Sequence, residues 1–286
     1  MHRVQSCMHG MLAPTKNIVI AALTSVLLLG VNARALDRTI AAGALRIHVS
    51  ESGTGPTVVF ESGMGEEIAT WNDVRPEITK FAHTIAYERP GLGSSQATSS
   101  PRTVTQMAED LHTILHAANA PSPYILVGHS LGGAIVQVFA HRYPAEVAGV
   151  VLVDPEDVRL LNKLHAQMSP QDWEARRKAL DQAIPNLSPA QQAELHTVER
   201  GQDEVTPALP LPHVPLTVLT GTLKNPSFPG NPLEQDLKLA MHNDLVAATP
   251  GAKHILVPTS RHYIQNDAPQ AVVQAVRDMV SQVAKR

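Results

Sequence analysis

Short apolar runs of strand length alternate with stretches of helical period along most of this chain. Six of the runs are rich in β-branched residues, as expected of strands that are buried on both faces. They occupy residues 57–60, 84–87, 124–127, 147–153, 216–220 and 254–257, and an alternating, half-exposed run at 45–49 precedes them. This alternation predicts an α/β fold in which helices cover both faces of a mostly parallel, doubly wound sheet.

Two segments carry the apolar stripe of a helix that packs against such a sheet. The first covers residues 104–118, where apolar side chains recur at steps of three and four, and it ends before Pro121. The second covers residues 271–279, and Asp267 with Pro269 forms its expected start.

Residues 155–212 break this rhythm because they contain polar helical stretches, at 171–184 and 189–200, and no convincing strand. A crossover between parallel strands needs only about a dozen residues. The segment is therefore predicted to be a helical lid, inserted between core parts at 36–154 and 213–286. An ordinary crossover with a long loop is the alternative.

The first 35 residues have the pattern of an export signal. Lys16 precedes an apolar run at 18–31, and Ala33-Arg34-Ala35 supplies the small-x-small motif after which signal peptidases cut. The run is shorter than the ~20 residues that span a bilayer, so cleavage is preferred to an uncleaved anchor. The mature chain is then expected in the periplasm or outside a bacterial cell, without stable membrane insertion. Met8 and Met11 are alternative starts.

Composition argues against several other functions. The only cysteine, Cys7, lies in the expected signal, which leaves no thiol for catalysis, metal binding or disulfides and favours a bacterial envelope protein. Aromatic residues make up 3% and the net charge is −3, so no nucleic-acid partner is expected. No H-E-x-x-H motif, Walker loop or dinucleotide fingerprint occurs, so neither a metal nor a cofactor is expected.

The most informative motif is Gly128-His129-Ser130-Leu131-Gly132, between an expected strand and a helical stretch. A sharp strand-to-helix turn would lift the Ser130 Oγ above the carboxyl edge of the sheet, and glycines on both sides would prevent Cβ clashes. A serine that merely caps the helix would not need both glycines. Ser130 is therefore interpreted as a nucleophile.

Four motifs in order then resemble the α/β-hydrolase superfamily over nearly the whole mature chain. Besides the serine turn, residues 61–65 (Glu-Ser-Gly-Met-Gly) are similar to its HG-x-G oxyanion turn, and 87–94 (Tyr-Glu-Arg-Pro-Gly-Leu-Gly-Ser) to its Y-D-R-P-G-x-G-x-S stretch. Residues 260–263 (Ser-Arg-His-Tyr) are similar to its histidine loop. Departures are Ser62, Glu88 and Ser260-Arg261, where many members have histidine, aspartate and glycine. The resemblance implies an α/β-hydrolase sheet with an inserted helical lid.

The resemblance also implies the base and the acid. His262 follows the last strand, where the family has its catalytic histidine, while His129 is interpreted as structural. The usual place for the acid, after residues 216–220, has none before Glu234 and Asp236. Asp154 follows the strand next to that of the nucleophile, as in haloalkane dehalogenases, and is our choice. A turn-forming Asp-Pro is the alternative reading of it, and the reserve acids are Glu156, Asp157 and Asp236.

The oxyanion donors implied by the family are the backbone N–H groups of Met64 and Leu131, although a tight glycine loop is the alternative at Met64. Apolar side chains of the insertion are expected to roof a substrate pocket. They are Leu160, Leu164, Met168 and Trp173, together with Leu161.

These groups predict hydrolysis of a carboxylic ester, of a small and apolar molecule, through an acyl-enzyme. A serine nucleophile excludes relatives that attack with aspartate, namely epoxide hydrolases and dehalogenases. Carbon–carbon, amide or perhydrolase chemistry on the same triad remains an alternative, as does a catalytically silent binding protein with this fold.

Overall fold

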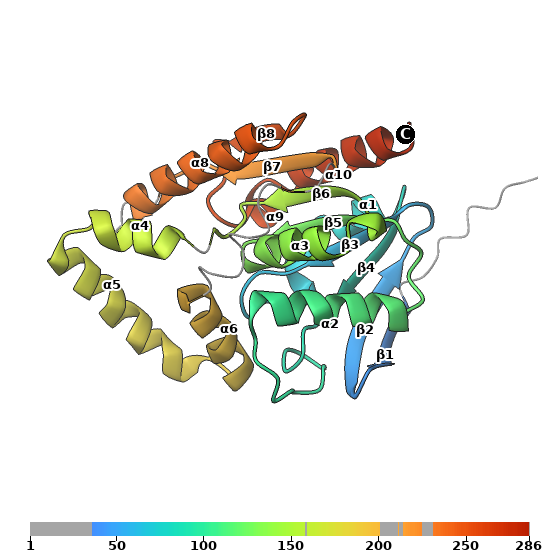
Figure 1. Ribbon diagram of the computed structural model, residues 1–286, viewed down its shortest axis with the longest axis horizontal. Helices are drawn as coiled ribbons and strands as arrows, with labels where there is room; N and C mark the ends of the chain where they lie inside the picture. The colour runs from blue at the N-terminus through green and yellow to red at the C-terminus, as the bar shows by residue number, and fades with distance from the viewer. Residues whose placement is uncertain (1–35, 158, 201–210, 212–213, 225–230, 286) are drawn as a thin grey trace, which may run out of the picture. The chain divides into compact units, whose positions relative to one another are not determined.

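The computed structural model describes residues 36–157, 159–200, 211, 214–224 and 231–285, so the predicted signal peptide lies outside it. In this part of the chain, eight strands form one sheet in the order β1-β2-β4-β3-β5-β6-β7-β8 (Figure 1). The strands are β1 (Leu36–Ala42), β2 (Leu45–Ser52), β3 (Thr57–Glu61), β4 (His83–Tyr87), β5 (Tyr124–His129), β6 (Val147–Val153), β7 (Leu216–Gly221) and β8 (Lys253–Val257).

Strand directions match the predicted fold class. Only the pairs β1–β2 and β2–β4 are antiparallel, and the pairs from β4 to β8 are parallel. Every residue of β3, β5 and β7 is buried, which explains why these strands appear in the sequence as continuous apolar runs. The prediction of a mostly parallel, doubly wound α/β sheet is confirmed.

Helices cover both faces of this sheet. One hydrophobic cluster packs α2 (Val104–Ala117) and α3 (Leu131–Arg142) against one face. A second packs α1 (Arg75–Ile78) and α10 (Pro269–Val283) against the other. The shorter helices are η1 (Ile68–Trp71), η2 (Pro144–Glu146), η3 (Ile184–Asn186) and α9 (Ile264–Asp267). None of the described helices is long and apolar enough to cross a membrane.

Helices α4 (Leu160–Gln167), α5 (Pro170–Ala183) and α6 (Pro189–Arg200) lie between β6 and β7 in the chain. They occupy most of the predicted insertion and lie together at one end of the sheet (Figure 1). Residues 158, 201–210 and 212–213 of that segment lie outside the described part. That these helices act as a lid stays a prediction.

Besides the short helices, strand β1 and helix α8 have no counterpart among the sequence expectations. Strand β1 contributes only Ile40 and Ala42 to the core, so its apolar pattern is weak. Helix α8 (Asn231–Ala248) has a different reason, because part of its buried face is polar. Its buried side chains include Gln235, Lys238 and His242, which a search for apolar stripes passes over.

Candidate active site

Ser130 occupies a sharp turn between β5 and α3. Its backbone has φ 50° and ψ −122°, a conformation outside the common regions that costs of order 1–3 kcal/mol, and its side chain makes no capping hydrogen bond to α3. A Cβ at Gly132 would collide with the Glu61 carbonyl oxygen, and one at Gly128 with the Gly132 carbonyl. The close approach of these backbones therefore requires glycine on both sides of the serine.

The structure brings Ser130, His262 and Asp154 into one hydrogen-bonded chain. His262 Nε2 lies 3.0 Å from Ser130 Oγ, and His262 Nδ1 lies 2.6 Å from Asp154 Oδ2. Ser130 and Asp154 are buried, whereas the His262 side chain keeps about a third of its surface exposed, at 32%. A neutral imidazole with this geometry can accept the serine proton at Nε2 while Nδ1–H donates to the carboxylate.

Asp154 is held as a carboxylate by three donors. The N–H of Gly221 donates to Oδ1 at 3.1 Å, while His262 and Lys238 both contact Oδ2. Burial raises the pKa of Asp154, but the Lys238 ammonium and the His262 hydrogen bond outweigh it and hold the pKa well below its usual range. The carboxyl group therefore stays ionised and available to His262.

Lys238 is the functional residue that sequence reasoning missed. It lies buried on α8, its Nζ 2.5 Å from Asp154 Oδ2 and 3.1 Å from His262 Nδ1. Burial lowers the pKa of Lys238, but Asp154 and Glu156 raise it above the ordinary value, so the side chain is an ammonium. One signal was present in the sequence: Gln235, Lys238 and His242 fall at i, i+3 and i+7, the spacing of one helix face.

This ammonium acts on His262, the candidate base. Burial of the larger part of the imidazole lowers the pKa of His262, and the neighbouring Lys238 charge lowers it further, to about 4. Because a base must be unprotonated to accept the serine proton, the acidic limb of kcat/KM is expected near pH 4 rather than near the ordinary histidine pKa of about 6.5.

Replacing Lys238 by methionine is expected to move that acidic limb upward by about one pH unit or more, because the imidazolium loses a repelling neighbour. The measurement is kcat/KM against pH. Lys224→Met is the matched control, since that exposed lysine pairs with Asp236 and not with the triad. An acidic limb that stays in place in Lys238→Met would contradict this electrostatic role.

The reserve acids are directed elsewhere. Asp157 pairs with Arg159 at 2.5 Å, and Asp236 pairs with Lys224 at 2.7 Å. Exclusion of water and the nearby acids raise the pKa of Glu156 to about 7, and its N–H donates to the Ser130 carbonyl at 2.9 Å. Of the carboxylates considered from the sequence, Asp154 is the one that the structure places on His262.

His129, interpreted from the sequence as structural, is fully buried beside the serine turn. Its Nε2 lies 3.1 Å from the carbonyl oxygen of His262, and its Nδ1 lies 3.1 Å from Glu66 Oε2. Glu66 also accepts the N–H of Gly63 at 2.9 Å. His129 thus connects the backbone of the histidine loop with the turn that carries Met64.

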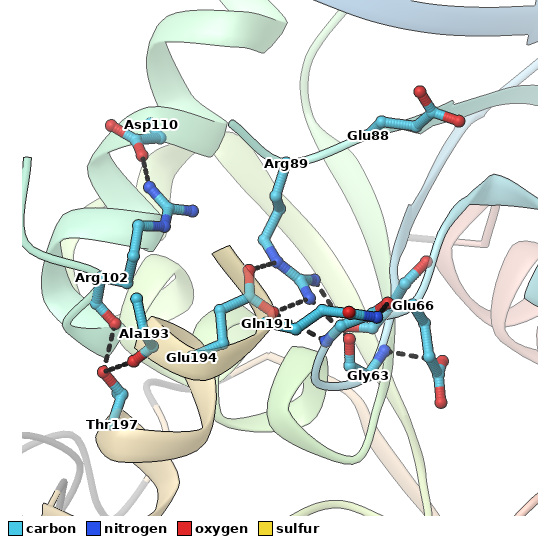
Figure 2. Close-up of polar contacts among 12 residues, drawn as sticks. Gly63, Glu66, Glu88, Arg89, Arg102, Asp110, Gln191, Ala193, Glu194 and Thr197 are labelled. Atoms are coloured by element: carbon cyan, nitrogen blue, oxygen red, sulfur yellow. Dashed lines mark hydrogen bonds and ion pairs between the residues drawn. The ribbon is translucent and has the colours of Figure 1, made fainter. Parts of the chain in front are cut away.

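That turn, residues 62–65, follows β3 and is held by charged side chains on both sides. Figure 2 shows the Arg89 guanidinium between this turn and helix α6. Arg89 donates to the carbonyls of Ser62 and Gly63 at 2.7 and 2.5 Å, and Glu194 of α6 accepts the N–H of Gly65 at 2.8 Å. The candidate oxyanion donor Met64 N–H therefore lies in a segment whose neighbouring peptides are fixed.

The predicted pocket residues are distributed over the insertion. Leu160 and Leu164 are buried on α4, Met168 is partly buried, and Trp173 stacks on His165 with ring centroids 4.2 Å apart. An apolar cavity of about 240 Å³ between α4, α5 and α6 is lined by Leu161, which was among the expected side chains, and otherwise by Arg176, Ala179, Leu180, Ala183, Leu195 and Val198. The pocket assignment of the four predicted side chains therefore stays a prediction.

Comparison with known proteins assigns the family. The model of the alpha/beta hydrolase fold family matches residues 56–249, and the chain belongs to this family. The uncharacterized protein YqjL of Bacillus subtilis (strain 168) is 26% identical over 243 residues, which cover 84% of this chain and 90% of YqjL.

Solved structures share the fold. A thermophilic esterase from Thermogutta terrifontis has a TM-score of 0.64 at 21% identity, covering 88% of this chain and 99% of the esterase. The enol-lactonase from Burkholderia xenovorans LB400 has a TM-score of 0.62 at 18% identity, covering 85% and 100%. The resemblance to the α/β-hydrolase superfamily that the motifs indicated is confirmed.

Proposed function

We propose that this chain is a serine hydrolase that cleaves carboxylic esters of small apolar molecules. The observation that carries the proposal is the unbroken hydrogen-bonded chain from Ser130 through His262 to Asp154, at 3.0 and 2.6 Å. A pKa of about 4 leaves His262 neutral at physiological pH, as a general base requires. The fold shared with an esterase and an enol-lactonase supports the same class of chemistry.

The reaction follows from the roles of these groups. His262 Nε2 takes the proton as Ser130 Oγ attacks the ester carbonyl, and Asp154 stabilises the imidazolium that forms. The N–H groups of Met64 and Leu131 bind the developing oxyanion, where each donor contributes roughly 2.7–4 kcal/mol to lowering the barrier. His262 then protonates the leaving alcohol, and a water molecule, deprotonated by the same histidine, releases the acid from Ser130.

A fluorophosphonate probe tests the nucleophile, with the adduct located by intact-mass and peptide mass spectrometry. We expect one adduct per wild-type chain, on Ser130, and none on Ser130→Ala. Thr220→Ser is a useful comparison, because this buried hydroxyl contacts His242 and His254 rather than the triad and should leave labelling unchanged. Absence of labelling in the wild type would favour a catalytically silent binding protein with this fold.

A panel of p-nitrophenyl esters of graded acyl length tests the bond type. Turnover that depends on chain length supports an esterase with an apolar acyl site, and p-nitroanilide analogues separate amide hydrolysis from it. Labelling of Ser130 without turnover of any ester would retain the nucleophile and reject the ester assignment, in favour of carbon–carbon or perhydrolase chemistry.

We also propose that the chain is exported and cleaved after Ala35. In support, the small-x-small motif Ala33-Arg34-Ala35 follows the apolar run at 18–31. Mass spectrometry of the protein recovered from the periplasm or medium of a bacterial host checks this, with Leu36 expected as the first residue. Recovery of the uncleaved chain in the membrane fraction would favour an anchor instead.

A further inference from the structure

The carbonyl of Gly63 and the N–H of Met64 belong to one peptide group. A trans peptide is planar, so its C=O and N–H point in opposite directions, and fixing one fixes the other. Arg89 Nη2 donates to the Gly63 carbonyl at 2.5 Å. The same carbonyl accepts the Glu66 N–H at 3.2 Å, so the guanidinium and this turn together set the direction of the Met64 N–H, the donor that would face the oxyanion.

Arg89 is itself positioned from the inserted helix. Glu194 on α6, with no exposed surface, binds the guanidinium through both carboxylate oxygens at 2.7 and 2.8 Å. Its Oε2 also accepts the N–H of Gly65 at 2.8 Å. Glu61 receives Arg89 Nη1 on the other side at 2.7 Å. Glu194 thus holds the turn both directly and through Arg89.

The charges keep this arrangement ionised. Burial raises the pKa of Glu194, but the Arg89 guanidinium and the Gly65 N–H outweigh it and leave the pKa below its ordinary value. An ionised carboxylate and a guanidinium with fixed bidentate geometry permit little rotation of either side chain.

We propose that Glu194 is a positioning residue for the oxyanion hole, so that helix α6 of the insertion completes the catalytic centre rather than only covering it. This inference rests on the proposed ester hydrolysis. The interactions act on the transition state, because the Met64 N–H is aimed at the charge that develops on the substrate oxygen. Loss of Glu194 should therefore lower kcat more than it changes KM.

The test compares Glu194→Gln with Thr197→Val in the full chain. Thr197 lies one turn further along α6, and its hydroxyl donates to the Arg102 carbonyl at 2.5 Å, so it docks the same helix without touching the turn. We expect kcat to fall about 10²-fold in Glu194→Gln with KM within a few-fold, and to change little in Thr197→Val. Hydrogen exchange of the peptide containing residues 62–65 should accelerate in Glu194→Gln alone.

Each outcome of this comparison either supports or contradicts the positioning role of Glu194. Equal losses of kcat in both variants would reduce Glu194 to a docking contact of α6, and an unchanged kcat in Glu194→Gln would overturn the positioning role while leaving the hydrolase intact. A wild-type chain that neither reacts with the phosphonate nor cleaves esters would overturn the proposed function first, and this inference with it. Glu194→Asp, which keeps the charge, should recover part of the lost kcat.

A second, independent observation concerns a cluster of three side chains near the start of strand β6. His112 and His116, one turn apart on α2, both direct Nε2 at Glu146 of η2, at 3.0 Å from Oε1 and 3.3 Å from Oε2. The three ligand atoms lie within 4.8 Å of one another. Glu146 precedes β6 and Asp154 follows it, so about 20 Å of strand separates this group from the triad.

These distances suit a transition-metal ion. Two ligands at about 2.0–2.1 Å from a tetrahedral Zn²⁺ lie about 3.4 Å apart, close to the observed nitrogen–oxygen separations. Two imidazoles at i, i+4 and one carboxylate form a His₂Glu set that leaves a fourth position for water. Stacking on Tyr143, with ring centroids 3.9 Å apart, fixes the His112 ring.

We propose that His112, His116 and Glu146 bind one Zn²⁺. Calorimetric titration of the chain with zinc chloride, without a histidine tag, is expected to give one site, with a raised thermal unfolding temperature. His116→Ala, at the more exposed ligand, should lose both effects, whereas His165→Ala, another exposed histidine, should lose neither. If the wild type takes up no zinc, or if His116→Ala still takes it up, the proposal is wrong and these side chains are joined by hydrogen bonds alone.

Discussion

Replacement of Asp154 by asparagine is expected to lower kcat for ester hydrolysis about 10⁴-fold, the effect seen when the acid of a Ser-His-Asp triad becomes an amide. In this chain the amide oxygen is expected at the position of Oδ1, where it accepts from the Gly221 N–H, so the amide nitrogen takes the position of Oδ2 beside His262. The amide nitrogen cannot accept from His262. The imidazole then carries its proton on Nε2, the nitrogen that faces Ser130. This tautomer cannot take the serine proton.

Steady-state kinetics on the preferred p-nitrophenyl ester would measure this loss. Asp157→Asn is the matched control, because Asp157 lies three residues further along the chain and pairs with Arg159. Circular dichroism must confirm that Asp154→Asn is folded, since the substitution also leaves the buried Lys238 without its closest counter-charge. A loss below about tenfold in a folded variant would mean that another group orients His262.

Much of this arrangement could be predicted from the sequence because it depends on local backbone chemistry. The serine turn needs glycine on both sides, and His262 and Asp154 each follow an apolar strand at a place where the resemblance to the α/β-hydrolase superfamily implies the base and the acid. The parallel topology then required the neighbours of β5 to end beside Ser130. These are consequences of order along the chain.

Groups that depend on tertiary contacts could not be predicted. Lys238 lies 84 residues from Asp154 in sequence, and Glu194 lies 105 from Arg89. Each was a charged residue within a polar helical stretch, which is ordinarily an exposed surface. A buried charge requires a partner of opposite charge, and the residues near Lys238 and Glu194 in the sequence do not identify that partner. Helix α8 was not predicted for the same reason, because part of its buried face is polar.

The largest expected effect on stability concerns Arg89. Its guanidinium is buried between Glu61 and Glu194, whose side chains are 1% and 0% exposed. Arg89→Met is expected to lower the free energy of unfolding at neutral pH by about 3–5 kcal/mol, because two buried carboxylates lose the charge that compensates them. Equilibrium unfolding in urea, with the slope compared between variants, would measure the loss.

The pH dependence of this loss provides a sharper test than its size. Burial already raises the pKa of Glu61 in the wild type, and without Arg89 it raises the pKa of both carboxyl groups above that of the unfolded chain, so protonation stabilises the folded variant. In the wild type, the pKa of Glu194 lies below its ordinary value, so its contribution is present at neutral pH and declines as the pH falls. The two stability curves are therefore expected to converge below about pH 5.

A second substitution separates the cost of unpaired charge from lost packing. Adding Glu194→Gln to Arg89→Met removes one of the two stranded charges, and the double variant should be more stable at neutral pH than the sum of the single losses predicts. Arg89→Lys keeps a charge but cannot bind Glu194 through two parallel N–H groups or reach both turn carbonyls in the same way, so it should recover stability better than kcat. A pH-independent difference, or strict additivity, would mean that Arg89 acts by filling space.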